Sequence, residues 1–346
     1  MSRAILWAFC VVLFVTADGR AQDAASVPAA SGQASRILFR ISTENTPNHV
    51  QSQAVRRFAQ LLSGKVGDRI EVEYHDAATL FRDKDVFSAL TEGKLEMAVP
   101  GTWHVARFQP DVNIFLMPVF YGRSAGENHA VLESDVGQEL NRRIEEALGV
   151  RIPGKWLDLG HANLYTLSRR LAGLGEVRGL KIRVAGGKAN EMRIEAAGAD
   201  AITIPWPDFP LWLDRGQVDG VLTTHETVRS AMLWTHGIRY CLEDREYFPM
   251  YVPMISARVW TLLPEDVRLA IADAWEDTAV LEREMAAQAQ IEAGEDLARH
   301  GVEIVIPDQA DIAQWRKRLS SSNEAIITRI GLDKDLYARA VRILDR

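Results

Sequence analysis

The chain has 346 residues, of which 47% are hydrophobic and 25% charged, and its formal charge is −7 at pH 7. This length predicts two domains or one large domain, and the composition is typical of a soluble globular protein. Because no basic stripe interrupts the mildly acidic balance, nucleic acid is excluded as an expected partner.

The first residues differ from the rest and predict export. A short basic start, Met1-Ser2-Arg3, precedes the uncharged run AILWAFCVVLFVTA over 4–17, which is too short to span a bilayer comfortably. We predict a secretory signal peptide over residues 1–21, cleaved after Ala17 or Ala21, because small residues and a polar stretch follow. An N-terminal membrane anchor is the alternative.

The segment over 22–35 is rich in Ala, Ser, Gly and Pro, which predicts a disordered lead-in. Once the leader is removed, Cys241 is the only cysteine, so no internal disulfide can form. No later stretch is apolar enough for a transmembrane helix. We therefore expect an exported, periplasmic protein that does not itself span the membrane after cleavage.

The first part of the mature chain alternates strands with helices. The residues IEVEY alternate strictly between apolar and polar side chains, as in a half-buried strand, whereas the apolar residues after Asn48 recur at helical spacing. The expected elements are strands over 36–42, 70–74 and 95–100, and helices over 48–62, 83–94 and 124–148. The order β-α-β-α-β predicts a parallel or mixed sheet covered by helices.

A second alternation follows and repeats this architecture. Its expected elements are strands over 154–168, 180–184, 201–205 and 218–223, and helices over 188–198 and 208–216. Asp208 is suited to cap the second helix, Pro210 to its first turn and Gly216 to its end.

The last part combines an extended stretch with a long helix. Residues 247–260 are expected to be extended, with Pro249 and Pro253 suited to an edge strand or a crossover. Residues 268–300 contain no proline and predict one long helix, or two in series, acting as a spine that touches both lobes. A strand over 302–307 and helices over 308–346 end the chain.

Motifs of common enzymes are absent. The chain contains no G-x-S-x-G, H-E-x-x-H, P-loop or G-x-G-x-x-G pattern, and His225-Glu226 lacks the second histidine of a zinc-binding helix. These absences lower the expectation of catalysis without excluding it.

Arg183 is the strongest candidate for binding chemistry. It lies between Ile182 and Val184 near a strand end, directly before Gly186-Gly187. Ligands of open α/β sheets bind outside the carboxyl ends of strands, and a guanidinium matches a carboxylate with two parallel hydrogen bonds. The alternative is an internal salt bridge with Asp208 or Asp219.

Further candidates end neighbouring strands. Trp206 can cover the apolar part of a ligand, with a place in the core as the alternative. Thr223, Thr224 and His225 can hydrogen-bond a polar ligand, with capping of the next helix as the alternative. A cation, an aromatic ring and hydroxyls at one rim predict an anion pocket.

Two strands in the first half of the chain are also followed by polar and aromatic residues that could bind a ligand. Its candidates are Glu44 and Asn45 after the first strand and Trp103 and His104 after the third. For Trp103 and His104, a packing role is the alternative.

Three stretches carry a resemblance to a known family. They are VRGLKIRVAGG…AAGADAITIPWPDFPLWLDRGQVDGV over 177–221, AATLFRDKDVFSALTEGKLEMAVPGT over 77–102 and FLMPVFY over 115–121. With them, nearly the whole mature chain resembles the substrate-binding proteins of tripartite ATP-independent periplasmic (TRAP) transporters.

The resemblance implies an α/β fold, namely a two-lobe periplasmic binding protein clamshell (type II-like) with mixed sheets, two crossover strands and a long spine helix. It also implies that Arg183 holds the substrate carboxylate and that Trp206 packs on the substrate. Asn163 stands where many relatives carry a second arginine, and Thr223 where many carry an asparagine. Fewer charges suggest a ligand with one carboxylate, and His225 with the extra tryptophans suggests an aromatic or apolar body.

We therefore expect a periplasmic solute-binding protein, not an enzyme, that captures a small organic anion and delivers it to integral membrane TRAP subunits, without a cofactor or metal. The expected ligand-binding residues are Arg183, Trp206, Thr223, Asn163, Trp103, Glu44, Asn45, Thr224, His225 and Asp208. The alternatives are a binding component of another importer, a sensor, a periplasmic enzyme using His225 with Glu226, and a pocket that chelates a cation with its ligand.

The expected lobes are discontinuous in the chain. The first covers 36–160 and 249–288, the second covers 161–248 and 289–316, and a helical segment over 317–346 follows. The hinge is expected near Gly160 and 247–253.

Overall fold

Residues 37–346 are described by the computed structural model. The predicted signal peptide, its cleavage sites and the lead-in lie outside the described residues. None of the described helices is both long enough and apolar enough to cross a membrane.

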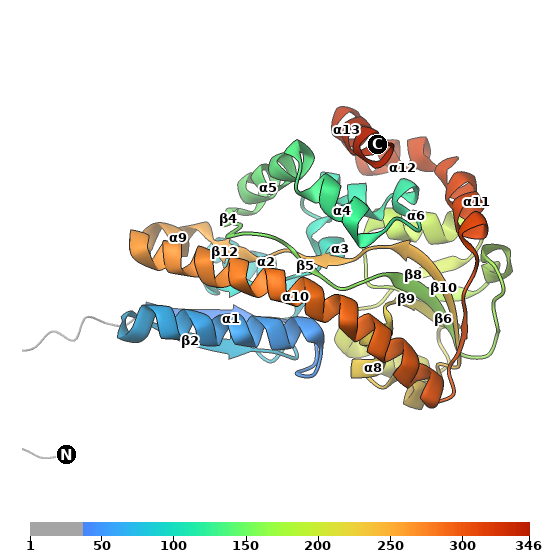
Figure 1. Ribbon diagram of the computed structural model, residues 1–346, viewed down its shortest axis with the longest axis horizontal. Helices are drawn as coiled ribbons and strands as arrows, with labels where there is room; N and C mark the ends of the chain where they lie inside the picture. The colour runs from blue at the N-terminus through green and yellow to red at the C-terminus, as the bar shows by residue number, and fades with distance from the viewer. Residues whose placement is uncertain (1–36) are drawn as a thin grey trace, which may run out of the picture. The chain divides into compact units, whose positions relative to one another are not determined.

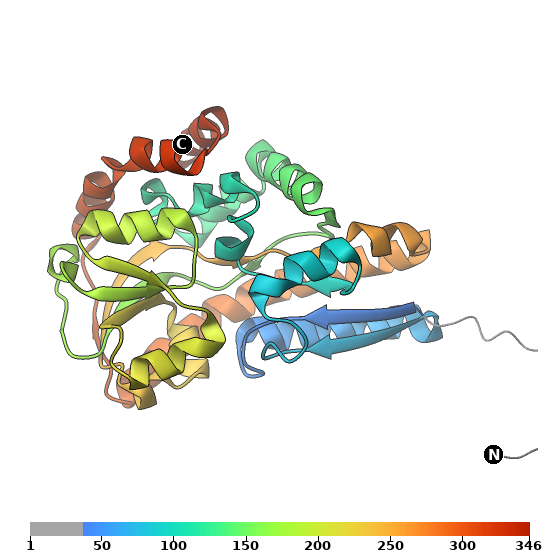
Figure 2. The ribbon, with the colours of Figure 1, turned by 180° about the vertical axis from the view of Figure 1, so that it is seen from behind.

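The first sheet has five strands in the order β2-β1-β3-β12-β4. They are β1 (Ile37–Ser42), β2 (Ile70–His75), β3 (Met97–Ala98), β4 (Val150–Arg151) and β12 (Met254–Ser256). β1 runs parallel to β2 and β3, whereas β12 runs antiparallel to β3 and β4, so the prediction of a mixed sheet is confirmed. The helices α1 (Val50–Val66) and α2 (Asp83–Glu92) pack on opposite faces of this sheet. Figure 2, the view from behind, shows the face that α2 covers.

The second sheet has six strands in the order β13-β10-β6-β9-β7-β8. They are β6 (Ala162–Thr166), β7 (Lys181–Val184), β8 (Asp200–Thr203), β9 (Gly220–Thr223), β10 (Tyr240–Tyr247) and β13 (Glu303–Val305). Its helices are α6 (Lys188–Ala197), α7 (Phe209–Asp214) and α8 (His225–Ser230). β7, β8 and β9 are parallel, as the strand–helix alternation predicts, and β10 is a strand that the sequence did not predict.

The chain crosses between the sheets through two short paired strands and one helix. The strands β5 (Leu157–Asp158) and β11 (Met250–Tyr251) are antiparallel to each other. The helix α10 (Glu265–Arg299) is continuous and packs against α1 and α8, so it contacts helices of both sheets (Figure 1). The crossover strands, the spine helix and the two-lobe α/β class are confirmed.

Two expectations about local structure are wrong. The stretch over 247–260 was expected to be extended throughout, but it ends at Ser256 and the helix α9 (Ala257–Leu262) follows. A helix is possible there because no proline stands between Pro253 and Pro264. The stretch expected to be one helix over 124–148 is two, α4 (Ala125–Leu132) and α5 (Asp135–Leu148), because Ser134 caps a new start by accepting from the Val136 amide.

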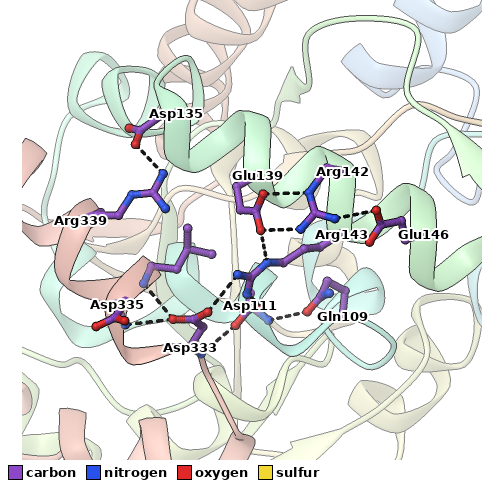
Figure 3. A network of polar contacts seen from close by, with 11 residues as sticks. Gln109, Asp111, Asp135, Glu139, Arg142, Arg143, Glu146, Asp333, Asp335 and Arg339 are labelled. Atoms are coloured by element: carbon purple, nitrogen blue, oxygen red, sulfur yellow. Dashed lines mark hydrogen bonds and ion pairs between the residues drawn. The ribbon is translucent and has the colours of Figure 1, made fainter.

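Three helices end the chain and are tied to its first half. They are α11 (Gln309–Ser320), α12 (Asn323–Ile330) and α13 (Lys334–Leu344). Figure 3 shows that Arg143 on α5 pairs with Asp111 and with Asp333, whose carboxylate also caps α13. The lobe boundaries remain a prediction; those at 288/289 and 316/317 fall inside α10 and α11.

Candidate functional site

A small cavity lies where the loops of both sheets meet the crossover strands. The first sheet contributes residues that follow β1 and β3, and the second contributes residues that end β7 and β9. Seven of the ten predicted site residues line it: Glu44, Asn45, Trp103, Arg183, Trp206, Thr223 and Thr224. The carboxyl ends of parallel strands thus meet at one site, as the strand–helix alternation predicts.

Arg183 lies near the end of β7 and is only 2% exposed. Its Nε and Nη2 donate to the carbonyl oxygen of Ile204 at 3.0 and 2.8 Å, which fixes the plane of the guanidinium. Its Cζ lies 4.9 Å from the ring centroid of Phe209 and 5.6 Å from that of Trp206. Backbone and aromatic contacts therefore hold the side chain, and Nη1 donates no hydrogen bond to any described residue.

Arg183 has no carboxylate partner within ion-pair distance among the described residues. The two alternatives fail, because Asp208 pairs with Arg82 and Asp219 accepts from the Lys181 amide. Burial lowers the pKa of Arg183 to about 10, although the charge of Glu44 opposes this change. The guanidinium thus stays positive at neutral pH, as a buried charge that awaits a partner.

Trp103 closes the cavity from the side of the first sheet. It lies on α3 (Thr102–Val105), and its ring meets that of Tyr251 at 5.5 Å. A Cβ on Gly186 would lie 3.5 Å from the Trp103 carbonyl oxygen, and one on Gly187 only 2.6 Å from Leu116. Both glycines also have positive φ, so this pair admits the close approach of the two halves.

Thr224, Asn45 and Thr223 all line the cavity, but they differ in their hydrogen-bond partners. Thr224 accepts from the Thr227 amide, so capping of α8 is confirmed for it although it also lines the cavity. Asn45 donates to Gln51 and to the Tyr251 hydroxyl, at 2.6 and 2.7 Å, and is held by these partners. Thr223 makes no side-chain hydrogen bond to a described residue, which leaves its hydroxyl for a ligand.

Two carboxyl groups and an imidazole lie together in the cavity. Glu44, Asp83 and His104 offer ligand atoms that all lie within 4.8 Å of one another. Burial, and then the charge of Glu44, raises the pKa of Asp83, whereas burial lowers the pKa of His104 to about 3. The sequence did not predict this set, because only the fold brings Asp83, at the start of α2, next to the other two.

Three predicted site residues do not reach the cavity. Asn163 and His225 line a second cavity behind it, where Asn163 accepts from the Arg245 amide and His225 contacts Tyr165 and Glu243. Asp208 pairs with Arg82 instead of binding a ligand, and its side chain does not cap α7.

Residues of the crossover segments also line the cavity and were not predicted. Tyr247, Pro249 and Tyr251 come from the stretch around β11, and Leu159 comes from the stretch after β5. The sequence signal was the aromatic run YFPMY, which was interpreted as an edge or crossover strand and as part of the hinge, but not as a lining of the site.

Glu226 connects the two halves beside the cavity. It belongs to α8, but its Oε1 accepts from the Val50 amide at the start of α1, at 3.0 Å. The carboxyl group is 1% exposed, and its Oε2 accepts no hydrogen bond. Burial raises the pKa of Glu226 to about 7.

Glu226→Gln is expected to flatten the pH dependence of stability. The pKa of Glu226 is about 4.5 in the unfolded chain and about 7 in the folded protein. Between these two pH values the folded protein therefore keeps a proton that the unfolded chain has already lost. Stability from this group is therefore complete below that window and falls as pH rises through it, by up to about 1.4 kcal/mol per pH unit. Urea unfolding of both proteins from pH 5 to 8 measures this; parallel profiles would contradict the expectation.

Comparison with known proteins gives a consistent result. Residues 41–329 match the model of the family described as bacterial extracellular solute-binding protein, family 7. The C4-dicarboxylate-binding periplasmic protein DctP of Rhodobacter capsulatus is 24% identical over 330 residues, which cover 90% of this chain and 91% of that protein. An uncharacterised protein of Sinorhizobium fredii is 28% identical over 188 residues, but these cover 54% of this chain and only 34% of that protein.

A solved structure has the same fold. The sugar acid binding protein DctPAm of Advenella mimigardefordensis, in complex with galactonate, superposes with a TM-score of 0.83. The sequence identity is 19%, over 90% of this chain and 98% of that chain.

Proposed function

Because the chain belongs to family 7 of the bacterial extracellular solute-binding proteins, we propose that it captures a small organic carboxylate around Arg183 and delivers it to the membrane subunits of a TRAP transporter. The proposal includes that the protein acts in the periplasm after its signal peptide has been removed. A relative named for C4-dicarboxylates and a structural neighbour solved in complex with galactonate support an organic acid as the ligand class.

The observation that carries the proposal is the unpaired Arg183. Its guanidinium is buried, held in orientation by Ile204 and free at Nη1. A ligand carboxylate supplies the missing negative charge and accepts charge-assisted hydrogen bonds. Thr223 stands free at the same rim to complete the contact.

Closure of the two halves follows from the same feature. A guanidinium enclosed without a counterion is costly, so an empty closed state is disfavoured and the ligand favours closure through its differential affinity. Two contacts already join the two halves: the ion pair between Arg82 and Asp208, and the hydrogen bond from the Val50 amide to Glu226. The membrane partner then meets a loaded, closed protein.

The geometry does not support the enzyme alternative. His225 contacts Tyr165 and Glu243 in the second cavity, whereas the Glu226 carboxylate contacts the Val50 amide. The two side chains thus serve different places and do not form an acid–base pair. Binding without turnover is the proposed activity.

A thermal-shift screen over carboxylic acids tests the function. We expect one or more acids to raise the melting temperature in proportion to RT ln(1 + [L]/Kd), and to be recovered unchanged afterwards. Mass spectrometry of ligand that co-purifies with the protein is an independent measurement. A screen in which amides of the same acids stabilise as well as the acids would overturn a carboxylate site.

Trp206→Ala is expected to weaken acid binding roughly 10-fold, the equivalent of about 1.4 kcal/mol. The half-buried ring covers the guanidinium and lines the cavity, so its loss lets water reach the ion pair and changes the order of preference among acids. Trp260→Ala on α9, a half-buried tryptophan outside the cavity, is the control. Calorimetry on both variants measures the effect, and an unchanged ligand profile for Trp206→Ala removes this ring from the site.

A further inference from the structure

Part of the cavity that contains Arg183 is lined by acidic side chains. Glu44 follows β1, Asp83 begins α2 and His104 lies on α3, so three separate segments bring their polar atoms to one point of the cavity. His104 Nε2 lies 3.7 Å from Asp83 Oδ2 and 4.0 Å from Glu44 Oε2. None of these contacts is a hydrogen bond at such a distance.

The three groups are buried, and the two carboxyl groups keep only backbone partners, since Glu44 accepts from the Asp83 amide at 3.3 Å and Asp83 is hydrogen-bonded to the backbone of Gly101. The side chains of Glu44 and Asp83 are each 7% exposed and that of His104 is 12% exposed. Glu44 Oε2 accepts no hydrogen bond from a described residue, and no described residue bonds to the His104 ring. Burial raises the pKa of both carboxyl groups, and the charge of Glu44 raises that of Asp83 further, whereas the charge of Arg183 in the same cavity lowers that of Glu44.

We propose that Glu44, Asp83 and His104 form a subsite for a protonated amine of the ligand, so that the protein takes up an amino-bearing carboxylic acid with its carboxylate on Arg183. This inference rests on the proposed function and narrows its ligand class. An ammonium group has three donors, and the subsite offers three acceptors, since the neutral imidazole accepts at Nε2 when its proton is on Nδ1.

The spacing of the acceptors lies between that expected around an ammonium group and that expected around a metal ion. Acceptors about 2.8 Å from one tetrahedral nitrogen lie about 4.6 Å apart. Ligands about 2.1 Å from tetrahedral zinc, or about 2.4 Å from calcium in neighbouring positions, lie about 3.4 Å apart. The observed separations of 3.7 and 4.0 Å fall between these two spacings, so a titration in EDTA, rather than the spacing, distinguishes an ammonium from a metal ion.

Charge favours an ammonium over the hydroxyls of a sugar acid. A hydroxyl can donate to one carboxyl group, but it brings no positive charge to two adjacent carboxyl groups whose charged forms are disfavoured by burial. An ammonium supplies that positive charge, while the carboxylate of the same molecule offsets Arg183. The cavity thus presents a positive and a negative end, which match a zwitterion in one orientation.

Matched pairs of acids test the inference. We would titrate alanine against lactate, β-alanine against 3-hydroxypropionate, 4-aminobutyrate against 4-hydroxybutyrate and phenylalanine against phenyllactate, in buffer with EDTA. In each pair only an ammonium replaces a hydroxyl. The best amino member is expected to bind at least about 10-fold tighter than its hydroxy partner, a difference typical of one buried charged contact.

Variants assign the preference to the subsite. Glu44→Gln and Asp83→Asn, singly and together, are expected to weaken the amino member at least about 10-fold and the hydroxy member by less than about 3-fold. Glu71→Gln, an exposed acid-to-amide change on β2, is the control and is expected to change neither. Equal loss for both members would overturn the subsite.

The outcomes separate this inference from the proposed function. If hydroxy acids or simple carboxylates bind the wild-type protein and no amino acid does, the subsite is wrong and the carboxylate receptor stands. If acid binding disappears in EDTA and returns with calcium or zinc, a metal occupies the three residues and the inference is overturned. If no acid of either kind binds, the proposed function itself fails.

Discussion

Arg183→Ala is expected to abolish stabilisation of the protein by its carboxylate ligand while the unliganded protein still folds. The guanidinium provides the one buried positive charge that lines the cavity among the described residues. Removing the guanidinium, the donor side of a charge-assisted contact with the ligand carboxylate, is expected to weaken affinity at least about 100-fold.

Folding should survive this change because Arg183 has no acidic partner to leave behind. Its hydrogen bonds go to a single backbone carbonyl, that of Ile204. A buried charge without a counterion is itself unfavourable, which offsets the cavity that alanine leaves. Calorimetry and thermal shift with the acid found in the screen measure the result.

Arg183→Lys refines the same prediction. Lysine keeps the charge but loses the planar fork, so binding is expected to be weak rather than absent. Retained wild-type affinity in Arg183→Ala would mean that the carboxylate lies elsewhere and that the site is wrong.

Arg193→Met is expected to have the opposite profile, with a large loss of stability and no specific loss of binding. Arg193 lies on α6, and its Nε donates to Glu246 Oε2 at 2.9 Å, with both side chains 1% exposed. It also donates to Leu116 and Asn190. Breaking such a pair leaves a buried carboxylate alone and costs about 3–5 kcal/mol.

Urea unfolding measures this cost, and a double variant identifies its cause. In Arg193→Met with Glu246→Gln the orphaned charge is gone, so part of the stability is expected to return. A single variant as stable as the wild type would contradict the expectation. Arg183 and Arg193 are thus a matched pair of buried arginines, one without an acid and one with an acid.

The parallel strands and their helices could be predicted, but β10 could not. The residues CLEDRE include four charged side chains, and charged residues are mostly exposed, so the local pattern does not predict a buried strand. In the fold, Asp244 accepts from the Tyr121 hydroxyl at 2.6 Å, and Glu246 pairs with Arg193. These partners lie more than 50 residues away in sequence, so only the folded chain reveals them.

The candidate site shows the same division. Arg183, Trp206 and Thr223 could be predicted because each stands at or just after a strand end, which local pattern reveals. The grouping of Asp83 with Glu44 and His104 depends on how three segments pack, which pattern does not reveal. His225 was assigned to the wrong cavity because the chain turns after Thr224 and directs the imidazole toward Tyr165.

The continuous spine helix α10 gives the molecule a lever arm. Its 35 residues make a rod about 52 Å long, and it packs against helices of both sheets. Helices of this length curve gently, and a bend of about 10° at the midpoint would carry either end through about 4–5 Å. Because α1 and α8 both pack against this rod, a bend of that size would shift the helices of the two sheets by several ångströms relative to each other.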